Sequence, residues 1–149
     1  MNEENRCHDM MSRQTLPKEQ RLHKKKDIEQ LFGKGKGFNL YPFRVVVYAH
    51  PSVNEDPSIP RFLVSVSKKR FHHAIKRNRI KRLVRESWRK NKSQLIVNCD
   101  NHKITLDIAL VYTATTILSY QEIEKKIKQL SLRLNKDYFH DEDNSTTAS

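Results

Sequence analysis

Cysteine is scarce in the 149-residue sequence, which contains only Cys7 and Cys99. Two cysteines are too few for a disulfide scaffold, and their number favours a reducing cytoplasm. No segment approaches the ~18–20 consecutive apolar residues that a membrane-spanning helix needs. The first ten residues include acidic side chains where a signal peptide requires basic ones. These absences predict a cytoplasmic protein without a membrane span.

Acidic residues are also few: 17 Asp and Glu stand against 29 Lys and Arg, which gives a formal net charge of +12. A domain this basic repels itself when folded, so the excess charge usually serves a polyanionic partner. Nucleic acid is the favoured partner. A membrane surface is disfavoured because no segment combines a long apolar face with a basic face at helical spacing.

The hydrophobic residues lie between two polar ends, so three parts are expected. Residues 1–16 should form a flexible tail, residues 17–137 one domain, and residues 138–149 a disordered acidic and polar tail. A central part of this length suits a single domain rather than two.

Apolar periodicity predicts the elements of this domain. Helices are expected at about 24–32, 73–90 and 120–135, and strands at 43–48, 61–67 and 104–112. The last helix should begin at a capping box formed by Ser119 and Glu122. This order predicts an α/β fold with helices packed on one sheet.

Glycine occurs only at Gly33, Gly35 and Gly37, directly after the first expected helix. Their alternation with Lys34 and Lys36 is similar to a phosphate-binding loop, but the full spacing of such a loop is absent. A flexible turn is the favoured interpretation.

Basic residues crowd one segment: twelve of the 25 residues from Lys68 to Lys92 are Lys or Arg, and Glu86 is the only acid. Exposed helices normally interleave both signs, because like charges one turn apart repel each other. An ordinary solvated helix face is therefore a poor interpretation.

Helical spacing separates this segment into two faces. The apolar side chains on one face are Ile80, Leu83, Val84 and Trp88. The basic side chains form a row of Arg77, Lys81, Arg85 and Arg89, with Asn78 and Arg82 beside it. Arginine suits phosphate oxygens because its guanidinium is a planar fork of donors. Asn78 either bonds a base edge or a 2′-hydroxyl, or is an ordinary surface amide.

No catalytic or metal site is predicted on the chain itself. Asp27, Glu86 and Asp107 fall on separate elements, and no motif joins them. Cys99 with His102, or His72 with His73, lacks a second ligand pair at a recognisable spacing. We expect the polypeptide to screen charge and position a substrate rather than to catalyse a reaction alone.

The basic segment closely resembles a known signature. Arg77-Asn78-Arg79-Ile80-Lys81-Arg82-Leu83-Val84-Arg85-Glu86 is similar to the arginine-rich signature of the ribonuclease P protein subunit. Ser65-Val66-Ser67-Lys68-Lys69 resembles the strand before it. Arg21-Leu22 and Asp27-Ile28-Glu29-Gln30-Leu31-Phe32, closed by Gly35, resemble the first helix of that family. The resemblance spans roughly Leu16 to Lys136.

The resemblance implies a four-stranded sheet with helices packed on it and a left-handed βαβ crossover. Physical principles alone predict the opposite hand, which about 98% of such crossovers have. The implied function is endonucleolytic removal of the 5′ leader from precursor tRNA, as part of a ribonucleoprotein. The partners would be a catalytic RNA and precursor tRNA, and Mg²⁺ would be bound mainly by the RNA.

The resemblance also implies two sets of site residues. The RNA-binding residues expected on and before the arginine-rich helix are Lys68, Lys69, Arg77, Asn78, Arg79, Lys81, Arg82, Arg85 and Arg89. A cleft for the single-stranded leader should be lined by Ile28, Phe32 and Tyr48, because aromatic walls stack on any base. The alternative is that Phe32 and Ile28 belong to the core. Ile28 stands where the family commonly has an aromatic residue.

Two other functional classes remain open from the sequence. A ribosomal or RNA-chaperone protein would need the same basic face, and only the ordered pair of signatures disfavours it. A DNA-binding module ranks third, because no dimerisation element or helix-turn-helix partner is evident.

Overall fold

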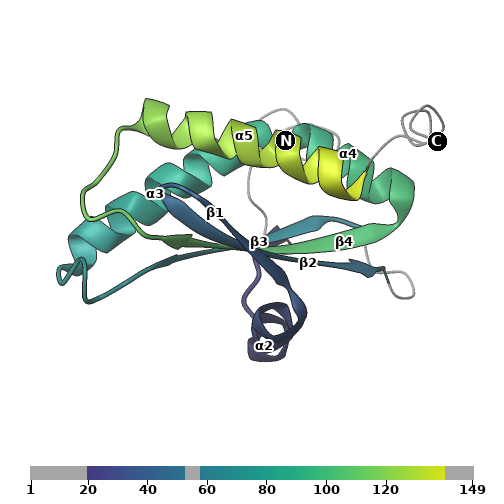
Figure 1. Ribbon diagram of the computed structural model, residues 1–149, viewed down its shortest axis with the longest axis horizontal. Coiled ribbons are helices and arrows are strands. Elements are labelled where there is room, and N and C mark those ends of the chain that lie inside the picture. Colours follow the sequence, from purple (N-terminus) through teal and green to yellow (C-terminus); the bar gives the residue numbers. More distant parts are fainter. Residues whose placement is uncertain (1–19, 53–57, 140–149) are drawn as a thin grey trace, which may run out of the picture.

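The computed structural model describes residues 20–52 and 58–139, which form one four-stranded mixed sheet in the order β1-β2-β4-β3 (Figure 1). The strands are β1 (Lys36–Leu40), β2 (Phe43–Pro51), β3 (Pro60–Val66) and β4 (Ile104–Tyr112). β2 pairs antiparallel with both β1 and β4, whereas β3 runs parallel to β4. The predicted class, a sheet covered by helices, is confirmed.

Helices cover both faces of this sheet. The helices are α2 (Lys25–Lys34), α3 (Ala74–Asn91), α4 (Ser93–His102) and α5 (Tyr120–Tyr138). In Figure 1, α3, α4 and α5 form a layer above the sheet, and α2 lies alone below it. The parallel pair β3 and β4 is connected through α3 and α4. The left-handed sense of this crossover stays a prediction from the resemblance.

Side-chain alternation along β2 explains why both faces are covered. The side chains of Phe43, Val45 and Val47 belong to the large core between the sheet and the layer of α3 and α5. Val46 and Tyr48 belong to a smaller apolar cluster between the sheet and α2. Successive strand residues face opposite sides of a sheet, so a strand with apolar residues on both faces needs a helix on each.

The capping box predicted for the last helix is present. The Ser119 hydroxyl accepts a hydrogen bond from the Glu122 backbone N–H at 3.2 Å, and the Glu122 carboxylate accepts one from the Ser119 N–H at 3.0 Å. α5 continues to Tyr138, three residues beyond the predicted 135, and Phe139 is buried. The ordered domain therefore extends past the predicted boundary at 137. The predicted tail at 1–16, and residues 140–149 of the other, lie outside the described residues.

Two elements were not predicted. β1 occupies part of the segment that was interpreted as a flexible turn, and α4 follows α3 after Lys92 alone. The flexible-turn interpretation of Gly35 is wrong, because a Cβ at this position would collide with the Leu31 carbonyl oxygen and the Val46 side chain. Glycine is needed there for close packing where α2 passes into β1.

Candidate RNA-binding surface and leader cleft

α3 is held by a thin apolar seam. Ile80, Val84 and Trp88 are fully buried against the sheet, and the Trp88 ring stacks on Phe62 with a centroid distance of 4.8 Å and an interplanar angle of 7°. The helix also packs against α5. The opposite side of α3 is thereby left facing solvent.

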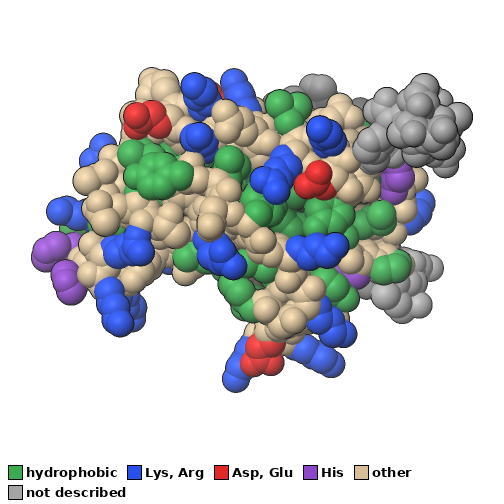
Figure 2. Space-filling model, in the orientation of Figure 1, with side chains coloured by type: hydrophobic (Ala, Val, Ile, Leu, Met, Phe, Trp, Pro, Cys, Tyr) green, Lys and Arg blue, Asp and Glu red, His purple; other side chains and the backbone are tan. Residues whose placement is uncertain are grey.

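Unpartnered cations occupy that solvent-facing side. Arg79, Arg82 and Arg85 are exposed and make no hydrogen bond or ion pair with any residue in 20–52 or 58–139. Lys68 and Lys69, which follow β3 at the approach to α3, are exposed as well. Figure 2 shows one face of the molecule, with Lys and Arg side chains spread over the helix layer and around α2 and few acidic side chains between them. Such a surface favours a polyanion.

Four of the predicted RNA-binding residues line one hollow of about 440 Å³. They are Asn78, Arg82, Arg85 and Arg89, and the hollow is completed by Arg21 and Glu86. Arg85 and Arg89 of the predicted row line the hollow, whereas Arg77 and Lys81 of that row do not.

Glu86 is neutralised within this hollow. Arg89 donates to both carboxylate oxygens of Glu86, from Nε to Oε2 at 3.2 Å and from Nη2 to Oε1. The hydrogen bond from Arg89 keeps the pKa of Glu86 below its ordinary value. The one acid of the segment therefore stays charged and paired, and Arg21, Arg82 and Arg85 leave the hollow with net positive charge.

Arg21 is a residue of this surface that the sequence did not identify as RNA-binding. The Arg21 segment pairs with the outer edge of β3: Arg21 forms a parallel bridge with Phe62, and the Leu22 N–H donates to the Phe62 carbonyl at 2.9 Å. An edge strand offers unpaired backbone groups, and this segment uses them to approach α3. The sequence did not indicate that Arg21 belongs to this surface, because Arg21 lies far from the arginine-rich segment in sequence.

Arg77 has a structural task besides any contact with RNA. Its Nη1 donates to the carbonyl oxygens of Phe71 and His72, each at 2.8 Å. These bonds tie the turn before α3 to the first part of the helix. The sequence-based assignment of Arg77 to RNA stays a prediction.

Of the three predicted cleft residues, Ile28 and Phe32 lie on α2, and Tyr48 lies on β2 in the sheet face that α2 covers. Ile28 and Tyr48 pack in the same cluster, around the buried residues Leu31 and Val46. Phe32 belongs to neither apolar cluster of the described residues, and it is 49% exposed. Because Leu31 is the α2 residue that is fully buried, the alternative that Phe32 is a core residue is wrong.

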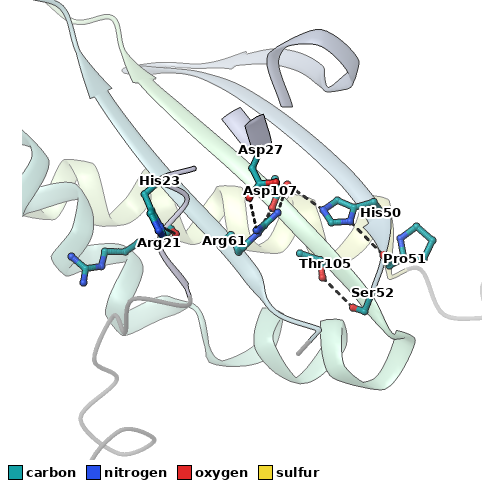
Figure 3. Close-up of polar contacts among 9 residues, drawn as sticks. All are labelled: Arg21, His23, Asp27, His50, Pro51, Ser52, Arg61, Thr105 and Asp107. Carbon is teal, nitrogen blue, oxygen red and sulfur yellow. Dashed lines mark hydrogen bonds and ion pairs between the residues drawn. The ribbon is translucent and has the colours of Figure 1, made fainter. Parts of the chain in front are cut away.

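A polar network fastens α2 to the sheet (Figure 3). Arg61 on β3 donates to both carboxylate oxygens of Asp107 on β4, at 2.7 and 2.9 Å, and to Asp27 of α2 at 3.0 Å. His50 on β2 lies 3.1 Å from the same Asp107 carboxylate. Burial raises the pKa of Asp107, but the hydrogen bonds from His50 and Arg61 outweigh it and hold that pKa below its ordinary value.

The described residues contain no group of three or more His, Cys, Asp or Glu side chains that could hold a metal ion. Cys99 is buried, and burial raises the pKa of its thiol to about 12. In the same residues, no helix is long and apolar enough to cross a membrane.

Comparison with known proteins identifies this arrangement. The family model described as Ribonuclease P matches residues 16–135. The chain belongs to the ribonuclease P protein family. A relative is the ribonuclease P protein component of Porphyromonas gingivalis, which is 38% identical over 119 residues, covering 80% of this chain and 85% of the relative.

Solved structures of ribonuclease P proteins share the fold. The Staphylococcus aureus RNase P protein has a TM-score of 0.57 and 25% identity, and the match covers 78% of this chain and 95% of that one. The RNase P protein from Thermotoga maritima has a TM-score of 0.58 and 24% identity, with 76% and 96% covered. The resemblance drawn from the arginine-rich signature is thereby confirmed at the level of the family.

Proposed function

We propose that this chain is the protein subunit of ribonuclease P and assists removal of the 5′ leader from precursor tRNA. In this role the basic side of α3 binds the catalytic RNA, and the surface between α2 and the sheet binds the single-stranded leader. The observation that carries the proposal is the exposed group of Arg79, Arg82 and Arg85, which lack partners among residues 20–52 and 58–139. Cations gathered in this way are stabilised when phosphates lie against them.

A general RNA-binding role, of the ribosomal or chaperone type, is not favoured. The family match covers residues 16–135 and includes the segment around α2 as well as α3. A separate leader surface is needed by a subunit that distinguishes precursor from mature tRNA, whereas a general RNA-binding protein needs only the basic side. The half-exposed ring of Phe32 supports such a surface.

The hydrolysis itself we assign to the RNA. The described residues offer no cluster that fits Mg²⁺, so we propose that Mg²⁺ is held mainly by the RNA subunit and derive no step through a metal on this chain. Its described residues supply positive charge, stacking surfaces and a fixed distance between the two binding sites. We also propose that the complex acts in the cytoplasm.

Reconstitution tests this function directly. Cleavage of a precursor tRNA would be measured at physiological Mg²⁺ with the protein alone, a bacterial catalytic RNA alone, and both together. We expect efficient cleavage only with both. Cleavage by the protein alone would contradict the assignment of hydrolysis to the RNA, and an unchanged RNA activity would move the chain to the general RNA-binding class.

Phe32→Ala tests the leader cleft. We expect it to weaken binding of leader-bearing precursor by about 1–3 kcal/mol, the value of one base stacked on an aromatic ring. Binding of mature tRNA should not change, because Phe32 lies outside both apolar clusters. The measurement is the dissociation constant of the reconstituted enzyme for each RNA.

The control for this variant is Leu132→Ala, which removes an exposed side chain from α5 on the other side of the sheet. It should leave both dissociation constants unchanged. Equal losses for precursor and mature tRNA in Phe32→Ala would show a general defect and contradict the assignment of Phe32 to the leader.

A further inference from the structure

His50 has hydrogen-bond acceptors at both of its ring nitrogens (Figure 3). Nε2 lies 3.1 Å from Oδ2 of Asp107, and Nδ1 lies 3.4 Å from the Pro51 carbonyl oxygen. A carbonyl oxygen can only accept, and the Asp107 carboxylate is ionised because Arg61 donates to both of its oxygens. As an imidazolium His50 can donate to both acceptors at once, whereas the neutral ring can donate to only one of them.

The charges around His50 balance only in that state. Asp107 faces it from β4, Arg61 lies beyond Asp107 on β3, and Asp27 of α2 bonds the far side of Arg61. The four side chains sum to zero when His50 is protonated and to one negative charge when it is neutral. The hydrogen bond with Asp107 raises the pKa of His50 above its ordinary value of 6.5, so the change in charge is displaced towards neutral pH.

This group of four charges lies at the proposed leader cleft. The His50 ring stacks on Tyr48, with a centroid distance of 5.2 Å and an interplanar angle of 28°. Tyr48 packs in the cluster that contains Ile28, and Asp27 directly precedes Ile28 on α2. The His50 side chain is 24% exposed, so its charge can interact with the phosphates of a leader bound at this surface.

We propose that His50 is a positioning residue of the leader cleft, which as an imidazolium orients the Tyr48 ring and cancels the excess negative charge of Asp107 and Asp27 behind the bound leader. The proposal rests on the proposed function and extends it, because it makes recognition of the leader depend on pH. Loss of the proton leaves one uncompensated negative charge beside the leader phosphates. That charge repels the leader and leaves the body of the tRNA unaffected.

The test is the ratio of two dissociation constants of the reconstituted enzyme, for mature tRNA over leader-bearing precursor, between about pH 5.5 and 8.5. The ratio cancels the pH dependence of contacts with the tRNA body, and a 2′-deoxy nucleotide at the cleavage site would slow cleavage during binding. We expect the wild-type ratio to fall about threefold as the pH rises through the titration of His50. A change of this size corresponds to the interaction energy of one charge with a phosphate several ångströms away near a surface.

Two substitutions at His50 separate charge from structure. His50→Gln cannot be protonated, and we expect a ratio that is low at every pH. His50→Lys keeps a cation throughout this range, and we expect a ratio that is high at every pH. A merely structural role for His50 would lower the ratio in both variants and would leave its slope against pH unchanged. The control is His102→Gln, which changes an exposed histidine of α4 whose ring meets that of Phe139 at a tilt of 49°, and it should keep the wild-type profile.

The outcomes distinguish the two proposals. A wild-type enzyme that binds precursor and mature tRNA equally at every pH would contradict the leader-binding function itself. A wild-type ratio that stays high and constant across the pH range, or a His50→Gln profile that matches wild type, would overturn the role of His50 and leave that function intact.

Discussion

Asp107→Asn should lower the free energy of unfolding by about 2–4 kcal/mol, because it removes the charge from a buried group that accepts three hydrogen bonds from two neighbours. The Asp107 side chain is fully buried, and its oxygens bond Arg61 twice and His50 once. The amide of Asn cannot accept the same pair of bonds from the guanidinium. The expected loss of stability is smaller than it would be if Arg61 were left without any carboxylate, because Arg61 keeps its bond with Asp27.

Urea denaturation at neutral pH measures this loss, with Trp88 as the probe, since it is the single tryptophan of the chain and is fully buried. Asp27→Asn is the matched control, because it removes the partly exposed carboxylate at the other end of the network. We expect that variant to cost less than about 1 kcal/mol. Equal losses in the two variants would show that the buried carboxylate is not the centre of the network.

The destabilisation by Asp107→Asn should itself depend on pH, with a maximum between two titrations. The pKa of Asp107 is lowered in the folded state, so its contribution is present above the ordinary value of 3.8 and is lost as the pH falls through the lowered value. The pKa of His50 is raised, so its contribution is complete below 6.5 and is lost as the pH rises through the raised value. Denaturation curves at about pH 3, 5 and 8 should show the largest difference from wild type at the middle value.

Elements that carry their own periodic pattern were predictable from the sequence. The predicted stripe that identified α5 consists of Tyr120, Ile123, Ile127, Leu130 and Leu134. The last four side chains are buried, and Tyr120 is partly buried. The alternation along 104–112 identified β4 with its observed bounds. In α5 the local hydrophobic period agrees with the surface that the helix buries, so tertiary packing reinforces the local signal. β4 is buried on both faces, and its alternation marks only the face that packs in the larger core.

The two elements that depend on their neighbours for stability, β1 and α4, could not be predicted from the sequence. β1 has the sequence Lys-Gly-Phe-Asn-Leu, which is poor in β-branched residues, and it is a strand because each of its residues pairs with β2. α4 is short, and only Leu95 and Cys99 of its residues are buried. Two buried positions in ten residues give too weak a period to separate a helix from a polar loop.

The candidate site was predictable as a set of residues but not as an arrangement. The arginine signature identified α3, yet sequence alone could not show that Arg77 bonds two backbone carbonyls or that Arg21 reaches the same hollow as Arg82. Both facts depend on how the chain packs at the edge of β3. The network of Asp27, Arg61, His50 and Asp107 joins four elements, and no local pattern indicates such a contact.

The combined variant Arg82→Ala and Arg85→Ala should weaken binding of the catalytic RNA by about 10–100-fold at physiological salt, and should reduce the slope of log affinity against log salt by about two units. Each phosphate contact releases roughly one counterion, and these two arginines line the hollow without protein partners among the described residues. Their removal should leave the free energy of unfolding unchanged within about 0.5 kcal/mol, because both side chains are exposed. The dissociation constant would be measured across a series of salt concentrations.

The matched control is Lys128→Ala with Arg133→Ala, which removes the same net charge from α5, where each cation lies near an acid one turn away. If only the overall field of the protein attracts the RNA, both double variants should lose affinity alike. If phosphates occupy the hollow, the slope should change in the α3 variant alone. An unchanged slope in that variant would mean that Arg82 and Arg85 face solvent in the complex, and the RNA-binding surface would then have to be sought on another part of the molecule.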